Sequence, residues 1–264
     1  MKNNLKLLIL TLLTTTITFA QTAEDYFKPL KFRNIGPFRG GRSVSASGVV
    51  GDPMTYYMGT TGGGLWKTED AGQRWNNISD GFFEMGSVGA VAVSTHNTNI
   101  VYVGMGEHAP RGVMTSYGDG VYKSTDAGKT WKHMGLSETH HISRIAIHPT
   151  NPDIVYVAAQ GQLYGPNKER GIYKSVDAGK TWNRSNKGVP GGEKGRHGMD
   201  MSPANPENIY ACVEGKGGGF YLSTNRGASW KKQSSTTTSG NYYQELSIYC
   251  ITQFINFRRR LYPH

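Results

Sequence analysis

Short runs of β-branched and aromatic residues, separated by turns rich in Pro, Asn, Asp and Gly, recur along this chain. The clearest case is an apolar run at 142–147, a Pro- and Asn-containing turn at 148–153, and a second apolar run at 154–158. Short runs divided in this way are typical of antiparallel β-strands. No long segment shows the helical period, so the chain is predicted to be all-β. Equivalent pairs of strands are expected at 44–50 with 55–58, 88–93 with 100–103, and 198–201 with 209–213.

A third strand with a central aromatic residue follows each pair, and a repeated motif follows that strand. The motif reads Ser/Thr-x-Asp/Asn-x-Gly-x-x-Trp, and a fourth strand is expected to begin near its Trp. The four copies end at Trp75, Trp131, Trp182 and Trp230, which lie 56, 51 and 48 residues apart. Four strands repeated at a period of about fifty residues indicate the blades of a β-propeller.

The motif is expected to build a turn rather than an active site. The side chain at its third position can accept backbone N–H bonds within the turn, which Asn does as well as Asp. The Gly can adopt positive φ. The Trp can bury about 200 Å² between neighbouring sheets. The residues expected to form this turn are Asp70 with Trp75, Asp126 with Trp131, Asp177 with Trp182, and Asn225 with Trp230.

These motifs resemble the Asp-box, or BNR, repeat of sialidases, sortilins and related propellers, over roughly residues 30–245. The repeat spacing and hairpins such as Gly64-Leu65-Trp66-Lys67-Thr68 are most similar to sortilin-type propellers of secreted bacterial proteins, which often carry a glycosyl hydrolase label. The resemblance implies a propeller of four-stranded antiparallel blades. Sortilin-type propellers have more blades than this sequence encodes. We therefore expect about four blades plus part of a fifth, forming an incomplete ring.

The two ends of the chain differ from the repeats. Residues 1–20 combine Lys2 and Lys6 with an apolar run and a small residue before Gln21, which predicts a signal peptide and a secreted or periplasmic protein. No Cys follows this run to carry a lipid anchor, and no later segment predicts a membrane span. Blades are expected over 21–245. Residues 246–264 lack Gly, Asp and Glu, so we interpret them as foreign to the fold, for example after a frameshift; a divergent closing strand is the alternative.

Composition excludes several function classes. The formal net charge is +10, but Lys and Arg are scattered among acidic residues, without the aromatic-interleaved basic stripe that would indicate a nucleic-acid partner. Cys212 and Cys250 are too few for a disulfide framework. His140 and His141 are adjacent and would point to opposite faces of a strand, which makes a poor metal pair. Neither a metal nor another cofactor is predicted.

Candidate ligand-binding residues fall in the loops expected at the end of the blades opposite the motif turns. Loops on a rigid scaffold commonly carry function, and this mixture of charges could bind a carboxylate, a sugar or a peptide. Arg39, Arg42, Glu107, His108 and Arg111 are expected to converge there. The full candidate set is Arg39, Arg42, Glu107, His108, Arg111, His141, Tyr164, Arg170, Arg196 and His197.

Two functions remain open at this point. The resemblance to sortilins favours a non-catalytic module that binds protein or peptide ligands. The alternative is a carbohydrate-active enzyme, either a glycoside hydrolase or sialidase-like. Xyloglucan-cleaving propellers look similar around residues 57–67 but carry a catalytic Asp where this chain has Thr61, and Thr cannot replace a carboxylate in a two-carboxylate mechanism. The arginine set that a sialidase needs is also incomplete.

Overall fold

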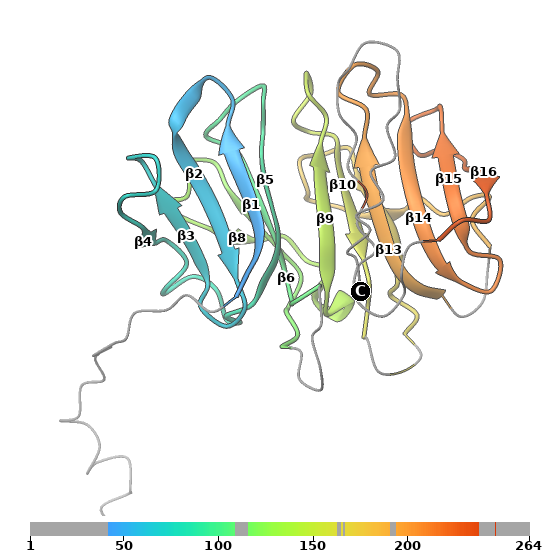
Figure 1. Ribbon diagram of the computed structural model, residues 1–264, viewed down its shortest axis with the longest axis horizontal. Coiled ribbons are helices and arrows are strands. Elements are labelled where there is room, and N and C mark those ends of the chain that lie inside the picture. Colours follow the sequence, from blue (N-terminus) through green and yellow to red (C-terminus); the bar gives the residue numbers. More distant parts are fainter. Residues whose placement is uncertain are drawn as a thin grey trace, which may run out of the picture. The chain divides into compact units, whose positions relative to one another are not determined.

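Four antiparallel sheets make up the described part of the chain in this computed structural model (Figure 1). The structure describes residues 42–108, 116–162, 165, 167–190, 194–237 and 246. Within these ranges there are sixteen strands and one short 3-10 helix, Ser137–Thr139. The predicted all-β class is therefore confirmed. The expected signal peptide, the fifth blade and nearly all of the tail lie outside the described residues and stay predictions.

Each sheet is a blade whose four strands follow one another in chain order. Blade 1 contains β1 (Ser43–Val49), β2 (Asp52–Thr60), β3 (Leu65–Thr68) and β4 (Asn76–Asn77), and blade 2 contains β5 (Val88–Val93), β6 (Val101–Met105), β7 (Val121–Ser124) and β8 (Lys132–His133). Blade 3 contains β9 (Ile142–Ile147), β10 (Val155–Ala159), β11 (Gly171–Ser175) and β12 (Asn183–Arg184), and blade 4 contains β13 (Lys194–Met201), β14 (Ile209–Gly215), β15 (Gly219–Ser223) and β16 (Lys231–Ser234). Four successive four-stranded blades form the incomplete propeller that the sequence predicts.

The first strands of neighbouring blades face one another, β1 with β5, β5 with β9, and β9 with β13 (Figure 1). β5 and β9 have the bounds that the apolar pattern predicts. β13 begins four residues earlier than expected, and its pairing with β14 shifts between Lys194 and His197. This segment is polar and rich in glycine, so it has no apolar run that would predict a strand. It forms one nevertheless, because its backbone pairing does not require apolar side chains.

The repeated motif forms the predicted turn between the third and fourth strands. In blade 2, Ser124 Oγ accepts a bond from the N–H of Gly128 and donates to Asp126 Oδ1, which also accepts the N–H of Thr130 at 2.9 Å. The residue before the motif Gly is also left-handed, with φ of 59° at Ala127. Its N–H donates to the carbonyl of Asn99, in the turn between the first two strands. The motif thus ties two turns together at one end of each blade, which we call the motif end.

Apolar side chains fill the space between successive blades. Tyr57 and Leu65 of blade 1 pack with Val101, Val103 and Tyr122 of blade 2 in one cluster. Equivalent clusters join blade 2 to blade 3 and blade 3 to blade 4. The core of the described structure is therefore a series of blade interfaces, and it positions the loops at the opposite end.

Candidate functional site

The connections between second and third strands lie opposite the motif end, as do the connections between blades. We call this the loop end; among described residues it includes 61–64, 106–108, 116–120, 160–162, 165 and 167–170. An equivalent backbone hydrogen bond holds the loop end in place in each of three blades. The N–H groups of Thr61, Gly106 and Gln160 donate to the carbonyls of Arg42, Ser87 and His141, at 2.9, 2.8 and 2.7 Å. The residue that follows the second strand is thereby held beside the start of a first strand.

Arg42 and Glu107 form an ion pair at the loop end, although 65 residues separate them. The Arg42 side chain is 46% exposed, whereas that of Glu107 is only 1% exposed. Oε1 of Glu107 receives the guanidinium bond, and Oε2 has no partner in the part of the chain that the structure describes. The structure therefore brings together two of the five residues expected to converge. Arg39 and Arg111 lie outside the described residues.

The other candidates differ in their surroundings. His108, His141 and His197 are all buried. His108 contributes to a cavity of about 200 Å³ lined mainly by the first strands, where the guanidinium of Arg144 lies 3.2 Å from both carboxylate oxygens of Asp200. Tyr164 lies outside the described residues, as does the side chain of Arg196.

Arg170 is engaged with the backbone of its own loop. Its Nε donates to the carbonyl of Gln160 at 2.8 Å, and its Nη2 donates to the carbonyls of Gly165, at 3.0 Å, and Gln162. A guanidinium that bonds three carbonyls holds a loop in one conformation. This arrangement supports the loop rather than presenting the charge of Arg170 to a ligand.

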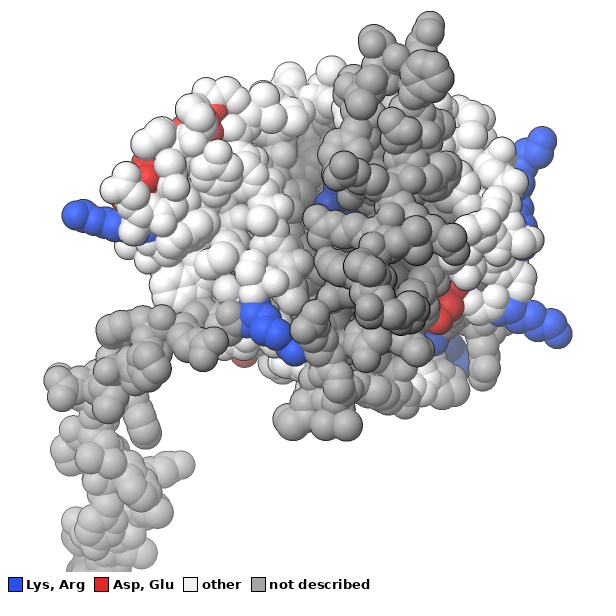
Figure 2. All heavy atoms as spheres, viewed as in Figure 1, with Lys and Arg blue, Asp and Glu red and all other residues white. Residues whose placement is uncertain are grey.

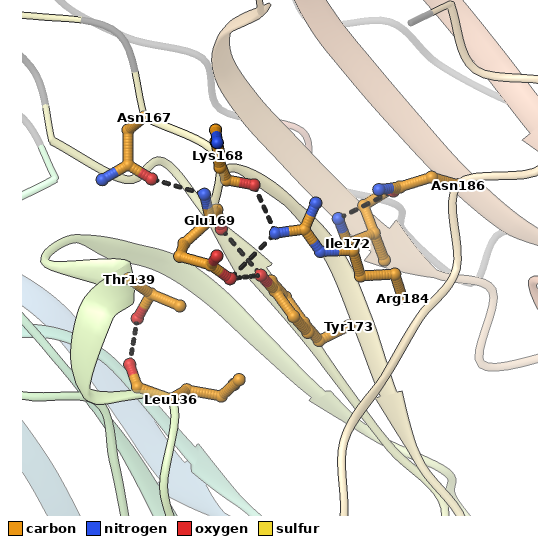
Figure 3. A network of polar contacts seen from close by, with 9 residues as sticks. All are labelled: Leu136, Thr139, Asn167, Lys168, Glu169, Ile172, Tyr173, Arg184 and Asn186. Atoms are coloured by element: carbon orange, nitrogen blue, oxygen red, sulfur yellow. Dashed lines mark hydrogen bonds and ion pairs between the residues drawn. The ribbon is translucent and has the colours of Figure 1, made fainter.

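A second set of bonds in the same loop joins Glu169, Tyr173 and Arg184 (Figure 3). The Glu169 carboxylate accepts bonds of 2.8 Å from the Tyr173 hydroxyl and from Arg184, while its N–H donates to Asn167. The Tyr173 bond, followed by that of Arg184, lowers the pKa of Glu169. Burial, reinforced by Glu169, raises the pKa of Tyr173 to about 12. The turn leading into β11 is therefore rigidly bonded and carries a stable negative charge.

Two further residues at the loop end were not singled out from the sequence. Tyr117 is 53% exposed, and its ring centroid lies 5.4 Å from that of His140. The N–H of Gly118 donates to the His140 carbonyl at 2.7 Å, which fixes this pair. Gln160 is buried at the end of β10. An aromatic residue within a polar loop, and an amide directly after an apolar strand, are the signals that could have identified them.

Charge and composition limit the chemistry of this site. Lys and Arg side chains in Figure 2 project at the outer margin near β15 and β16, where Lys231 and Lys232 are exposed. Among the residues that the structure describes, no group of three or more His, Cys, Asp and Glu side chains could hold a metal ion. Within the same segments, no helix has the length and apolar character needed to cross a bilayer. The described part of the loop end can thus offer hydrogen bonds, the ion pairs Arg42–Glu107 and Glu169–Arg184, and an aromatic face.

The Sortilin-Vps10 family, described as sortilin, neurotensin receptor 3, matches residues 119–256, and the chain belongs to this family. The chain is also 25% identical over 251 residues to the "Probable oligoxyloglucan-reducing end-specific xyloglucanase" of Neosartorya fischeri. That alignment covers 88% of this chain and 28% of the relative, so the chain spans less than a third of that protein's length.

Solved structures show the same fold. The GH74 enzyme of Niastella koreensis matches with a TM-score of 0.53 and 23% identity, over 71% of this chain and 29% of that enzyme. The GH74 xyloglucanase from Xanthomonas campestris matches with a TM-score of 0.53 and 18% identity, over 73% of this chain and 30% of that enzyme. The resemblance to sortilin-type propellers with glycosyl hydrolase-like relatives is therefore confirmed.

Proposed function

We propose that this chain is the glycan-binding part of a secreted or periplasmic carbohydrate-active propeller, and that its loop end binds a neutral polysaccharide of the xyloglucan type. The observation that carries the proposal is the alignment of 88% of the chain with a xyloglucanase. It favours the carbohydrate alternative over the leading expectation of a protein or peptide ligand. Peptide binding remains the second candidate because the chain belongs to the Sortilin-Vps10 family.

The loop end supports glycan binding through its mixture of groups. The exposed ring of Tyr117 offers an apolar face, and buried polar groups lie at the start of the same and the next loop. Ligand sites commonly combine aromatic surface with a few fixed polar groups that orient the ligand. A sugar ring has matching features, with apolar C–H faces and a rim of hydroxyl groups.

The proposed activity of the described residues is binding rather than hydrolysis. Thr61 stands where the resembling xyloglucanases carry a catalytic Asp, and its Oγ1 is buried without a partner among described residues. Glycoside hydrolysis generally needs two carboxyl groups, one acting as the acid and the other as the base or nucleophile. A hydroxyl at position 61 supplies neither role at neutral pH.

Titration calorimetry of the full chain with a xyloglucan oligosaccharide tests this function. We expect measurable binding that Tyr117→Ala weakens. Tyr56→Ala is the matched control, because Tyr56 is 41% exposed and pairs with Gly48 and Thr68 toward the motif end. Binding of peptides but not of oligosaccharides, or equal losses in the two variants, would contradict the proposal.

A further inference from the structure

A cavity of about 200 Å³ lies among the first strands of all four blades. Residues with small side chains or none leave this space between the strands, namely Ser45 of β1, Gly89 of β5, Ser143 of β9 and Gly198 of β13. Pockets that hold drug-sized ligands begin at roughly 300 Å³. The cavity therefore has room for one small group, such as a single sugar ring, rather than for a whole extended ligand.

Arg144 of β9 places a charged group on the wall of this cavity. Its side chain is 46% exposed, so a ligand can reach it. Only Nη2 of the guanidinium bonds to Asp200, at 3.2 Å from each carboxylate oxygen. Among the residues that the structure describes, Nε and Nη1 of Arg144 have no hydrogen-bond partner. Arg144 thus keeps N–H donors for a group from outside the chain.

The wall that carries Arg144 is held in place by hydrogen bonds. The hydroxyl of Ser143 donates a bond of 2.6 Å to the carbonyl of His197, which joins β9 to β13. Oδ1 of Asp200 accepts the N–H of Met201 at 3.0 Å, so the carboxylate beside the guanidinium is itself fixed. A polar group that is positioned before a ligand arrives loses little conformational entropy on binding.

Asp200 determines which ligand charge the cavity favours. Its side chain is only 12% exposed and is paired with Arg144, so the positive charge of the guanidinium is already balanced. A carboxylate entering the cavity would compete with Asp200 and be repelled by it. A neutral hydroxyl group can instead accept from Arg144 without disturbing the ion pair. Three apolar residues also line the cavity and suit the C–H faces of a sugar ring, namely Val44, Met199 and Leu246.

We infer that this cavity binds one sugar ring of a neutral glycan, with hydroxyl oxygens of the ring accepting hydrogen bonds from Nε and Nη1 of Arg144. The inference rests on the proposed glycan-binding function and adds a site to the exposed ring of Tyr117. His108, which belongs to the loop end, also lines the cavity and so connects the two regions.

Titration calorimetry of the full chain tests this assignment by comparing Arg144→Gln with Arg226→Gln. Arg226 is the matched control, because its side chain is 48% exposed and paired with Glu207, in the motif turn of blade 4. We expect Arg144→Gln to raise the Kd for a xyloglucan oligosaccharide at least about ten-fold, which corresponds to roughly 1.4 kcal/mol. Arg226→Gln should keep the Kd of the unmodified chain. An acidic oligogalacturonide should bind the unmodified chain more weakly than the neutral oligosaccharide does.

Four outcomes would overturn the inference. A folded Arg144→Gln chain with unchanged Kd refutes it while leaving glycan binding intact. If the unmodified chain binds no neutral oligosaccharide, both the inference and the proposed function fail. Tighter binding of the oligogalacturonide, lost in Arg144→Gln, would identify an anion site instead. If Arg144→Gln does not fold because Asp200 is left unpaired, the double variant Arg144→Gln with Asp200→Asn removes both charges together; unchanged binding by that folded variant also refutes the role of Arg144.

Discussion

The indole nitrogen of Trp182 donates a hydrogen bond of 2.8 Å to the backbone oxygen of Met134, which lies 48 residues earlier at the end of the preceding blade. Trp131 and Trp230 bond to Ile78 and Ser185 in the same way. In each case the acceptor comes three residues after the motif Trp of the preceding blade. The motif therefore joins blades as well as closing a turn.

Trp75 provides a natural contrast, because its indole donates to Gly72 within its own motif turn. We predict that Trp182→Ala lowers the free energy of unfolding by about 2–4 kcal/mol, through lost packing and a lost bond between blades. Trp75→Ala should cause less than half of that loss. Urea titrations of the two variants measure the difference, and equal losses would show that the inter-blade bond contributes nothing.

Gly128 tests the tight contact between blades 1 and 2. Its φ is +90°, and a Cβ there would lie 2.7 Å from Cδ1 of Ile78. We predict that Gly128→Ala destabilises the fold by about 2–4 kcal/mol, because backbone strain and overpacking act together.

Gly51 is the matched control for this substitution. It has φ of +83° but no atom within 4 Å of the added Cβ, so Gly51→Ala should lose only the backbone contribution of about 1–2 kcal/mol. Thermal melts of both variants at neutral pH supply the measurement. A Gly51→Ala loss as large as that of Gly128→Ala would exclude the inter-blade contact as the cause.

Asp126 should make stability depend on pH in an acidic window. Bonds from the Thr130 hydroxyl, the Thr130 N–H and the Ser124 hydroxyl lower its pKa from 3.8 to about 2. Because the folded pKa is the lower one, the stabilisation is present above pH 4 and is lost as the pH falls toward 2. Denaturant melts between pH 2 and 5 give the free energy of unfolding at each pH. This free energy should change less with pH for Asp126→Asn than for the unmodified chain.

Asn225 holds the Asp126 position in blade 4, and its Oδ1 accepts the N–H of Ser229 at 2.9 Å. The amide therefore makes the same turn without a titrating group, so Asp126→Asn should fold normally. If the free energy of unfolding of that variant depends on pH as steeply as that of the unmodified chain, folding does not lower the pKa of Asp126.

Short apolar runs predicted the blades well because the inner strands are covered on both faces; every residue of β6 and of β10 is buried. The strand pattern also placed Arg42 and Glu107 at one end, since both lie where strands end on the side away from the motif turns. It did not identify Tyr117. The proposed role of Tyr117 depends on its exposure and on its ring contact with His140, which brings distant segments together and leaves no periodic trace.

The loop position of Arg170 also predicted a ligand-binding role for this residue, which the contacts of its side chain do not favour. Its guanidinium bonds carbonyls of residues 160, 162 and 165. The number of backbone carbonyls that converge on one side chain depends on the local loop conformation, which residue type alone does not define. Resemblance to sortilins likewise favoured peptide ligands, whereas the alignment with a xyloglucanase supports glycans better.

The most direct test of glycan binding at the loop end is a crystal structure of the full chain with a bound xyloglucan oligosaccharide. We predict a sugar ring against the exposed ring of Tyr117 at the loop end. Oligosaccharide bound only at the motif end would contradict this account.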